Sequence, residues 1–231
     1  MSAVLDIAEK LLEELQCETV FEIPVFGGIP VSESILVSWI IMAVVVFACL
    51  LLVRNLEVES PGKKQMALEA VVTGLTNMIE GILGEEGKDY VVYICCVLLY
   101  IGLSNVIGLF GFKPPTKDVN VTAALAIMSI LLITLAGIRK KGILGWLKSF
   151  LEPVAVVLPI NILELFIRPL SLCMRLFGNV LGAFVVMELL KTVCPVFIPV
   201  PFSLYFDIFD GLIQAYVFVF LTSLFVKEAV E

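Results

Sequence analysis

The chain has 231 residues, of which 60% are hydrophobic, against roughly 45–50% in soluble proteins; its mean hydropathy is +1.07. Its formal net charge of −7 gives no sign of the clustered basic face that nucleic-acid binding needs. Histidine is absent, which excludes a histidine-ligated metal site and a histidine proton relay. We predict an all-α polytopic membrane protein with one membrane domain, residues 1–231.

A window of about 20 residues predicts five membrane spans in chain order. They cover residues 34–53, 90–112, 119–138, 154–190 and 202–226. The fourth is too long for one upright crossing, so it is expected to tilt steeply or to continue past the bilayer. Residues 1–33 form an outer N-terminal segment. Within it, Met1–Glu22 lacks the basic start and apolar centre of a secretory signal, so no cleavage is expected.

The connections between the spans differ in basic residues, which sets the expected orientation. With the N-terminus outside, nine basic residues fall on the inner side: Arg54, Lys63, Lys64, Lys88, Arg139, Lys140, Lys141, Lys148 and Lys227. Four fall on the outer side: Lys10, Lys113, Lys117 and Lys191. We therefore predict that the N-terminus lies outside and the C-terminus in the cytoplasm.

Residues 60–83 are predicted to form a different kind of helix. Their apolar residues recur at helical spacing, while Glu69 and Glu80 fall on another face. Ser60 is a suitable N-cap with Pro61 in the first turn. This pattern indicates an amphipathic helix lying on the cytoplasmic surface of the membrane. The alternative is a short sixth crossing, which would expose both glutamates to lipid at high cost.

A stripe of polar and small residues follows the fourth span. The spacing is three or four throughout, which places all of its members on one helical face: Asn161, Glu164, Arg168, Ser171, Arg175, Asn179 and Gly182. Glu164 and Arg168 have the favourable order for an i,i+4 ion pair. Gly178 and Gly182 form a surface of small residues that lets another helix approach closely. The alternative is a stripe that only joins helices within one bundle.

Arg175 fits that alternative poorly. A cation at the bilayer centre costs at least about 2.5–3.5 kcal/mol, and arginine cannot be deprotonated. No carboxylate lies within a turn of Arg175 on its own span. Its partner is therefore expected to be Asp207 or Asp210 of the last span, or a group on another chain. A fixed cation in the membrane indicates ion transport.

The last span repeats the pattern. Asp207, Asp210 and Gln214 are three and four residues apart, again on one face. In an antiparallel arrangement, Gln214 comes near the level of Arg175, both aspartates lie toward the outside and Glu164 toward the inside. The alternative is that the aspartates, chiefly Asp207, cap the helix outside the lipid.

Three motifs together resemble the a subunit of F-type rotary ATP synthases. They are IRPLSLCMRLFGN from Ile167 to Asn179, KPPTKDVNVT from Lys113 to Thr122, and LIQAY from Leu212 to Tyr216. The order of the spans agrees as well. The resemblance implies a stator that faces a ring of c subunits, with the b-subunit stalk and the rest of the synthase as partners, in the plasma membrane of a bacterium.

The resemblance also implies site residues. Arg175 takes the position of the family's essential arginine, between two aqueous half-channels that carry H⁺ or Na⁺. Asn179 and Gln214 match its polar partners, Glu164 an inner acidic position, and Gly178 and Gly182 the packing surface against the ring. Two positions depart from the family: Phe184 stands where many members carry Glu or His, and Asp207 where His or Glu is frequent.

No nucleophile with a base, phosphate loop or metal cluster is found in the sequence, so we expect no cofactor and no catalysis by this chain alone. The six cysteines have no metal-binding spacing. The rival function is a small secondary ion transporter that uses an intramembrane Arg/Asp pair. Such transporters are marked by internal repeats, and the arginine-bearing span is unique in this chain.

Overall fold

The computed structural model describes residues 19–23, 29–54, 62–150, 158–193 and 199–231. A short hairpin of β1 (Thr19–Ile23) and β2 (Ile29–Ser32) is followed by helices throughout. The long helices are α2 (Glu33–Val53), α3 (Lys63–Leu83), α4 (Val91–Val106), α5 (Val119–Ser149), α6 (Leu158–Val193) and α8 (Gly211–Val230). Shorter helical segments are η1 (Glu85–Tyr90), η2 (Ile107–Phe110), η3 (Pro115–Lys117), α7 (Pro199–Ser203) and η5 (Leu204–Asp210).

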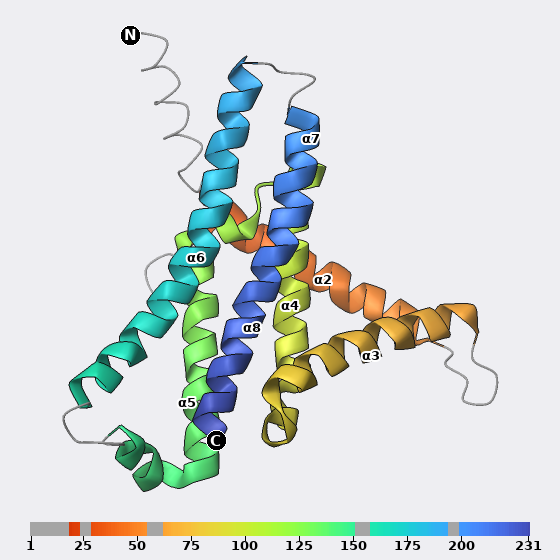
Figure 1. Cartoon of the computed structure of the whole chain (residues 1–231). Coiled ribbons are helices and arrows are strands. Elements are labelled where there is room, and N and C mark those ends of the chain that lie inside the picture. Colours follow the sequence, from red (N-terminus) through yellow and green to blue (C-terminus); the bar gives the residue numbers. More distant parts are fainter. Residues whose placement is uncertain (1–18, 24–28, 55–61, 151–157, 194–198) are drawn as a thin grey trace.

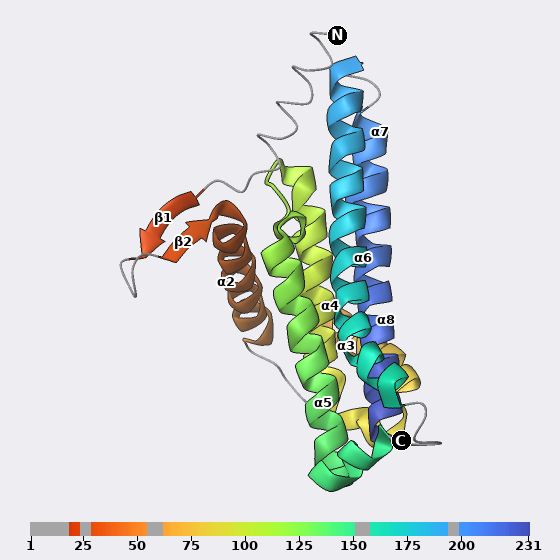
Figure 2. The same ribbon diagram turned by 90° about the vertical axis from the view of Figure 1, so that its left-hand side faces the viewer.

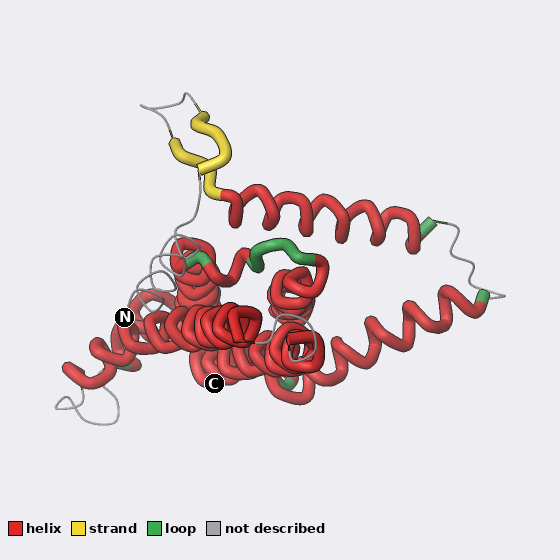
Figure 3. Tube along the Cα trace, turned by 90° about the horizontal axis from the view of Figure 1, so that it is seen from above, coloured by secondary structure: helices red, strands yellow, loops and turns green. Residues whose placement is uncertain are grey.

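Helices α4, α5, α6 and α8 form a bundle, with α2 and α3 leaning outward beside it (Figures 1 and 3). The core of the bundle is apolar and draws several residues from each of its four helices, among them Ile101, Leu125, Leu176 and Phe218. Helix α2 touches the bundle through its first half, where Ser38 Oγ lies 2.8 Å from Tyr100 Oη. The predicted all-α polytopic membrane fold is confirmed.

Six helices in the described residues are long and apolar enough to cross a membrane. Five coincide with the predicted spans, and the sixth is α3, where an interfacial helix was predicted. Figure 3 shows α3 running across the direction of the bundle, and it is the least apolar of the six. The predicted cap at Ser60 and Pro61 lies outside the described residues, as do residues 1–18 and the first residues of the predicted fourth span.

Helix α5 contains the predicted third span and continues past its predicted end at residue 138 to Ser149. The helix breaks within this extension at Gly142, whose φ of 74° suits glycine. The turn brings Trp146 back against Gly137, where an added Cβ would lie 3.1 Å from Trp146 Cδ1. A glycine at each of these two positions therefore lets a second helical segment fold under the end of the bundle.

The last two long helices run antiparallel and side by side (Figures 1 and 2). Pro169 lies inside α6, where it cannot donate to the helical ladder, and the first part of α6 leans away from the bundle (Figure 1). The predicted last span is a continuous helix from Pro199 to Val230. Its segment η5 is a π-helix, which the sequence did not predict.

Helices α4 and α8 approach closely at Gly211. A Cβ at this position would lie 2.8 Å from Asn105 Cβ, and Asn105 Nδ2 donates to Gly211 O over 2.9 Å. The hydrogen bond ties α4 to the first residue after the π-helix. Glycine is thus required here by the space between two backbones and not by its φ.

Gly211→Ala is expected to destabilise the protein by about 1–3 kcal/mol, because the two helices must separate to admit the methyl group. Gly81→Ala is the matched control, since a Cβ there has nothing within 4 Å. The measurement is the thermal unfolding temperature of the two variants in detergent. Equal unfolding temperatures would show that the contact at Gly211 tolerates a larger side chain.

Candidate functional site

The predicted stripe on α6 lies on the side of the helix that the rest of the chain leaves uncovered. Ser171, Arg175, Gly178, Asn179 and Gly182 are all exposed. The adjoining side of the helix is buried against the bundle through Leu172, Cys173 and Leu176. The stripe therefore does more than join helices within this chain, because most of it faces outward.

Arg175 is exposed and forms no hydrogen bond or ion pair with any described residue. Asp207 and Asp210, its predicted partners within the chain, do not pair with it. Of the two predicted alternatives, a partner on another chain remains. Its immediate apolar neighbour Met174 is also exposed, so the uncovered surface continues around the arginine.

Asn179 and Gln214 meet one turn along α6 from Arg175. Asn179 Nδ2 donates to Gln214 Oε1 over 2.7 Å. Gln214 is only 3% exposed, and its Nε2 has no hydrogen-bond partner among the residues that the structure describes. The sequence placed Gln214 near the level of Arg175, and this contact agrees with that placement. A buried amide with a free donor is costly, which marks this point of the interface between α6 and α8 as a polar site.

A cavity of about 440 Å³ extends from this amide pair toward the end of the bundle that carries α7. We call it the aspartate cavity, because Asp207 and Asp210 line it together with Gln214, Asn179 and Phe184. Lys113 and Lys191 also line it. The structure thus brings the predicted polar residues of the last span into one space with the end of the stripe.

Asp207 is held firmly within the π-helix. Ser203 Oγ donates to Asp207 Oδ2 over 2.7 Å. Its other carboxylate oxygen lies against Gly108, where an added Cβ would be 2.9 Å away. For Asp210, by contrast, the described part of the chain supplies neither a hydrogen bond nor an ion pair. The two aspartates are therefore not equivalent.

Phe184, at the position where the family carries an acid, has an unexpected neighbour. The ammonium of Lys117 lies 3.4 Å from the centre of its ring, a cation–π contact. Lys117 is 6% exposed. A glutamate at position 184 would therefore lie within reach of a buried cation. The sequence gave no signal for this contact, because 67 residues separate the two side chains.

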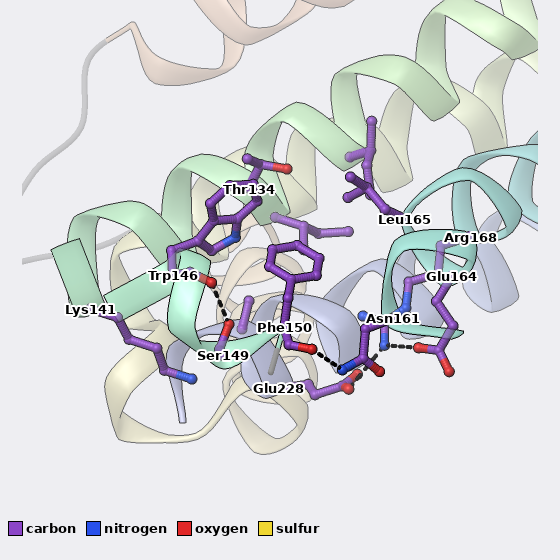
Figure 4. A pocket seen from close by; sticks show the side chains of 13 residues that line it. Thr134, Lys141, Trp146, Ser149, Phe150, Asn161, Glu164, Leu165, Arg168 and Glu228 are labelled. Atoms are coloured by element: carbon purple, nitrogen blue, oxygen red, sulfur yellow. Dashed lines mark hydrogen bonds and ion pairs between the residues drawn. The ribbon is translucent and has the colours of Figure 1, made fainter. Parts of the chain in front are cut away.

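A second cavity, of about 350 Å³, lies at the opposite end of α6 (Figure 4). We call it the Arg168 cavity. Arg168 Nη2 lies 2.8 Å from Glu164 Oε2 and 2.9 Å from Glu228 Oε1, and its guanidinium lies 4.7 Å from the centre of the Phe225 ring. Asn161 Nδ2 donates to Phe150 O over 2.9 Å. The predicted pair of Glu164 with Arg168 is confirmed.

Glu228 is a site residue that the sequence analysis missed. Its ion pair with Arg168 joins the end of α8 to the start of α6, across 60 residues of sequence. In the sequence it is one of several charges near the C-terminus, and nothing in its spacing distinguishes it from Glu231. Among the described residues, no group of three or more Cys, Asp or Glu could hold a metal ion.

These features define a polytopic helical membrane protein whose exposed helix face carries an arginine with no partner in the described residues, between two cavities that carboxylates line. The sequence profile of the family described as ATP synthase A chain matches residues 35–227. A subunit a from Moorella thermoacetica is 34% identical over 89% of this chain and 94% of its own length. The subunit a of Propionigenium modestum, named as sodium ion specific, is 32% identical over 88% of this chain and 75% of its own length.

The chain belongs to the ATP synthase A chain family. It is accordingly a non-catalytic subunit of the membrane sector of an F-type ATP synthase, an integral membrane protein that serves ATP synthesis and ion transport. The resemblance in the three motifs is confirmed, and the secondary-transporter alternative is displaced.

Glu228→Gln is expected to destabilise the protein by up to about 1 kcal/mol, because it removes one of two carboxylates from Arg168 at a partly exposed site. Glu231→Gln is the matched control. Glu231 directly follows the same helix, but its ion pair with Lys227 is long, at 3.8 Å. Thermal unfolding in detergent compares the two. If both variants melt together with the parent, the Arg168–Glu228 pair contributes nothing to stability.

Proposed function

We propose that this chain is the stator that passes H⁺ or Na⁺ between two aqueous half-channels and the carboxylates of a rotating c ring. The aspartate cavity is the outer half-channel, and the Arg168 cavity is the inner one. Arg175 separates them. This proposal assigns ion translocation to Arg175, Asn179, Gln214, Asp207, Asp210, Glu164, Ser171 and Arg168.

The position of Arg175 between the two cavities carries the proposal. Along α6 it lies seven residues from Arg168 and four from Asn179, or about 10 Å and 6 Å at 1.5 Å per residue. Each cavity holds carboxylates and ends short of the arginine. An ion that leaves one cavity must therefore pass a fixed positive charge to reach the other.

The exposed side of α6 is suited to a ring of helices. Gly178 and Gly182 have nothing within 4 Å of an added Cβ, so a neighbouring helix can approach the backbone there. A carboxylate on that helix would find Arg175 without a competing partner. Two unit charges 4 Å apart attract by about 4 kcal/mol at an effective dielectric of 20, which favours the ionised carboxylate as it passes.

The electrostatic barrier at Arg175 can be compared with the energy that an ion gains from the membrane potential. Moving one charge across 100 mV is worth about 2.3 kcal/mol, so a continuous water path past Arg175 would dissipate the gradient. The cation blocks that path because it repels H⁺ and Na⁺ equally and does not titrate. A ring carboxylate can pass it, since that group arrives as an anion and leaves neutralised.

The remaining assignments follow the family and the charge pattern. The basic connections favour an N-terminus outside and a cytoplasmic C-terminus, with α3 lying in the inner membrane surface. The expected partners are the c ring, the b-subunit stalk and lipid, in a bacterial plasma membrane. The sodium-specific relative is compatible with either ion here, because the ion-binding carboxylate belongs to the ring.

Arg175→Ala is expected to abolish ATP-driven ion pumping and ion-driven ATP synthesis while the complex still assembles. The reason is that the exposed arginine supports no contact within the described chain, so its removal leaves the fold intact. The measurements are ion flux in vesicles and subunit content of the purified complex. Coupled transport at the parental rate in an assembled complex would contradict the assignment.

The two cavities are expected to open to opposite sides of the membrane. Cysteines placed at Asp207 or Asp210 should react with a membrane-impermeant thiol reagent from outside, and a cysteine at Glu164 from inside. The native cysteines must first be replaced. Cys49, Cys95, Cys96 and Cys173 are free thiols, and Cys17 and Cys194 lie outside the described residues. Labelling of all three positions from one side would refute the two-path arrangement.

A further inference from the structure

We propose that Asp210, and not Asp207, is the carboxylate that exchanges the transported ion in the aspartate cavity, and that Asp207 is a positioning residue. The inference rests on the proposed function, because it divides the roles within the outer half-channel. It differs from the family pattern, which places the titrating residue at the position of Asp207. The inference is supported by the different surroundings of the two carboxylates, which line the same cavity.

Asp207 has the surroundings of a structural group. One oxygen accepts the Ser203 hydroxyl at 2.7 Å, four residues earlier on the same helical segment. The other packs against Gly108 so closely that a methyl group there would collide with it. A carboxylate with one oxygen bonded and the other crowded by a neighbouring backbone is poorly placed to take up and release an ion in each cycle. It does fix the π-helix against η2, and this sets the direction of the residues that follow.

Asp210 has the surroundings of a relay. It is partly exposed and lines the cavity, and no partner in the described chain competes for it. Gln214 follows one turn later, with a buried Nε2 for which the described residues supply no acceptor. Beyond it, Asn179 bonds to Gln214 at 2.7 Å and stands one turn from Arg175. Asp210 is therefore the carboxylate without a partner in the described chain, and it lies one turn from the Gln214–Asn179 pair that is itself one turn from the arginine.

The π-helix explains why the two aspartates differ. In a regular helix, residues three apart share a face, and the two carboxylates would be interchangeable. The wider turn of η5 ends at Asp210, and Gly211 N–H reaches back to Ile208 O and Phe206 O. The bond from Asn105 Nδ2 to Gly211 O fixes this transition. π-Helical turns are frequent at functional sites, and here the transition separates a held carboxylate from a free one.

The experiment compares single substitutions in the purified complex, reconstituted into vesicles. Asp210→Asn should lower ATP-driven ion flux by about 100-fold or more, the scale of a lost proton-transfer group. Asp207→Asn keeps a side-chain oxygen for Ser203, so its loss of flux should be far smaller. Asp210→Glu should recover most of the flux, which a purely structural role would not allow. Glu188→Gln, an outer carboxylate that lines neither cavity and pairs with Lys191, is the control.

Each outcome decides the matter. Equal losses in the two single variants would overturn the division of roles, as would a larger loss in Asp207→Asn or a failure of Asp210→Glu to recover flux. The double variant Asp207→Asn/Asp210→Asn tests the outer path itself. If it pumps at the parental rate, as both single variants do, the outer path does not use these residues, and that part of the proposed function fails as well. If both singles pump normally and only the double fails, the aspartates are interchangeable and this inference is wrong.

If Asp210→Asn prevents assembly, labelling supplies the test instead. A cysteine at position 210 in the assembled complex should react faster with a charged thiol reagent than one at position 207, because the latter lies in the niche formed by Ser203 and Gly108. The reverse order of reactivity would also overturn the proposal.

Discussion

The structure depends on one unneutralised charge. Arg175 is a permanent cation on a face of α6 that no described part of the chain covers, and it has no partner there. In lipid, such a cation is tolerated only if an anion, a polar group or water compensates its charge. If Arg175 binds a partner on another chain, the exposed stripe and the small residues beside it are explained. The two cavities with their carboxylates, which end before the arginine on both sides, are explained as well. Under the proposed function, the partner of this arginine is a carboxylate on the moving ring.

The rest of the bundle places groups around that charge. Close contacts at Gly211 and Gly108 bring α4 and the segment after it against the start of the last helix, which points two aspartates into one cavity. At the other end, Glu228 and Glu164 share Arg168, so this second arginine is neutralised while Arg175 is not. The difference between the two arginines of α6 is therefore one of partners and not of chemistry. Arg168 fixes the first part of α6 to α8 through its ion pair with Glu228, whereas Arg175 in the middle of α6 stays available to a partner.

Much of this arrangement was predictable from the sequence, where local spacing decides it. The three–four spacing placed the stripe on one face, paired Glu164 with Arg168, and set Gln214 near the arginine. The features that could not be predicted arise from contacts distant in sequence. Glu228 is identified only when α8 returns beside α6, and Lys117 only when the loop before α5 folds over Phe184. The π-helix could not be predicted from a periodicity of 3.6 residues per turn. Its end at Gly211 is bonded to Asn105 on a neighbouring helix, a contact distant in sequence. The break at Gly142 could not be predicted either, since a positive φ inside a helical run has no signature beyond glycine itself.

The central claim is that the partner of Arg175 is a ring subunit, and site-specific photo-crosslinking tests it most directly. A photoreactive side chain at Met174, beside the arginine and exposed on the uncovered face, would be activated in the intact synthase in native membranes. The account predicts an adduct with the c subunit, and none from the same group at Leu172, which is buried on the opposite side of α6. Adducts from Met174 only to lipid or to other parts of this chain, in an assembled complex, would contradict it.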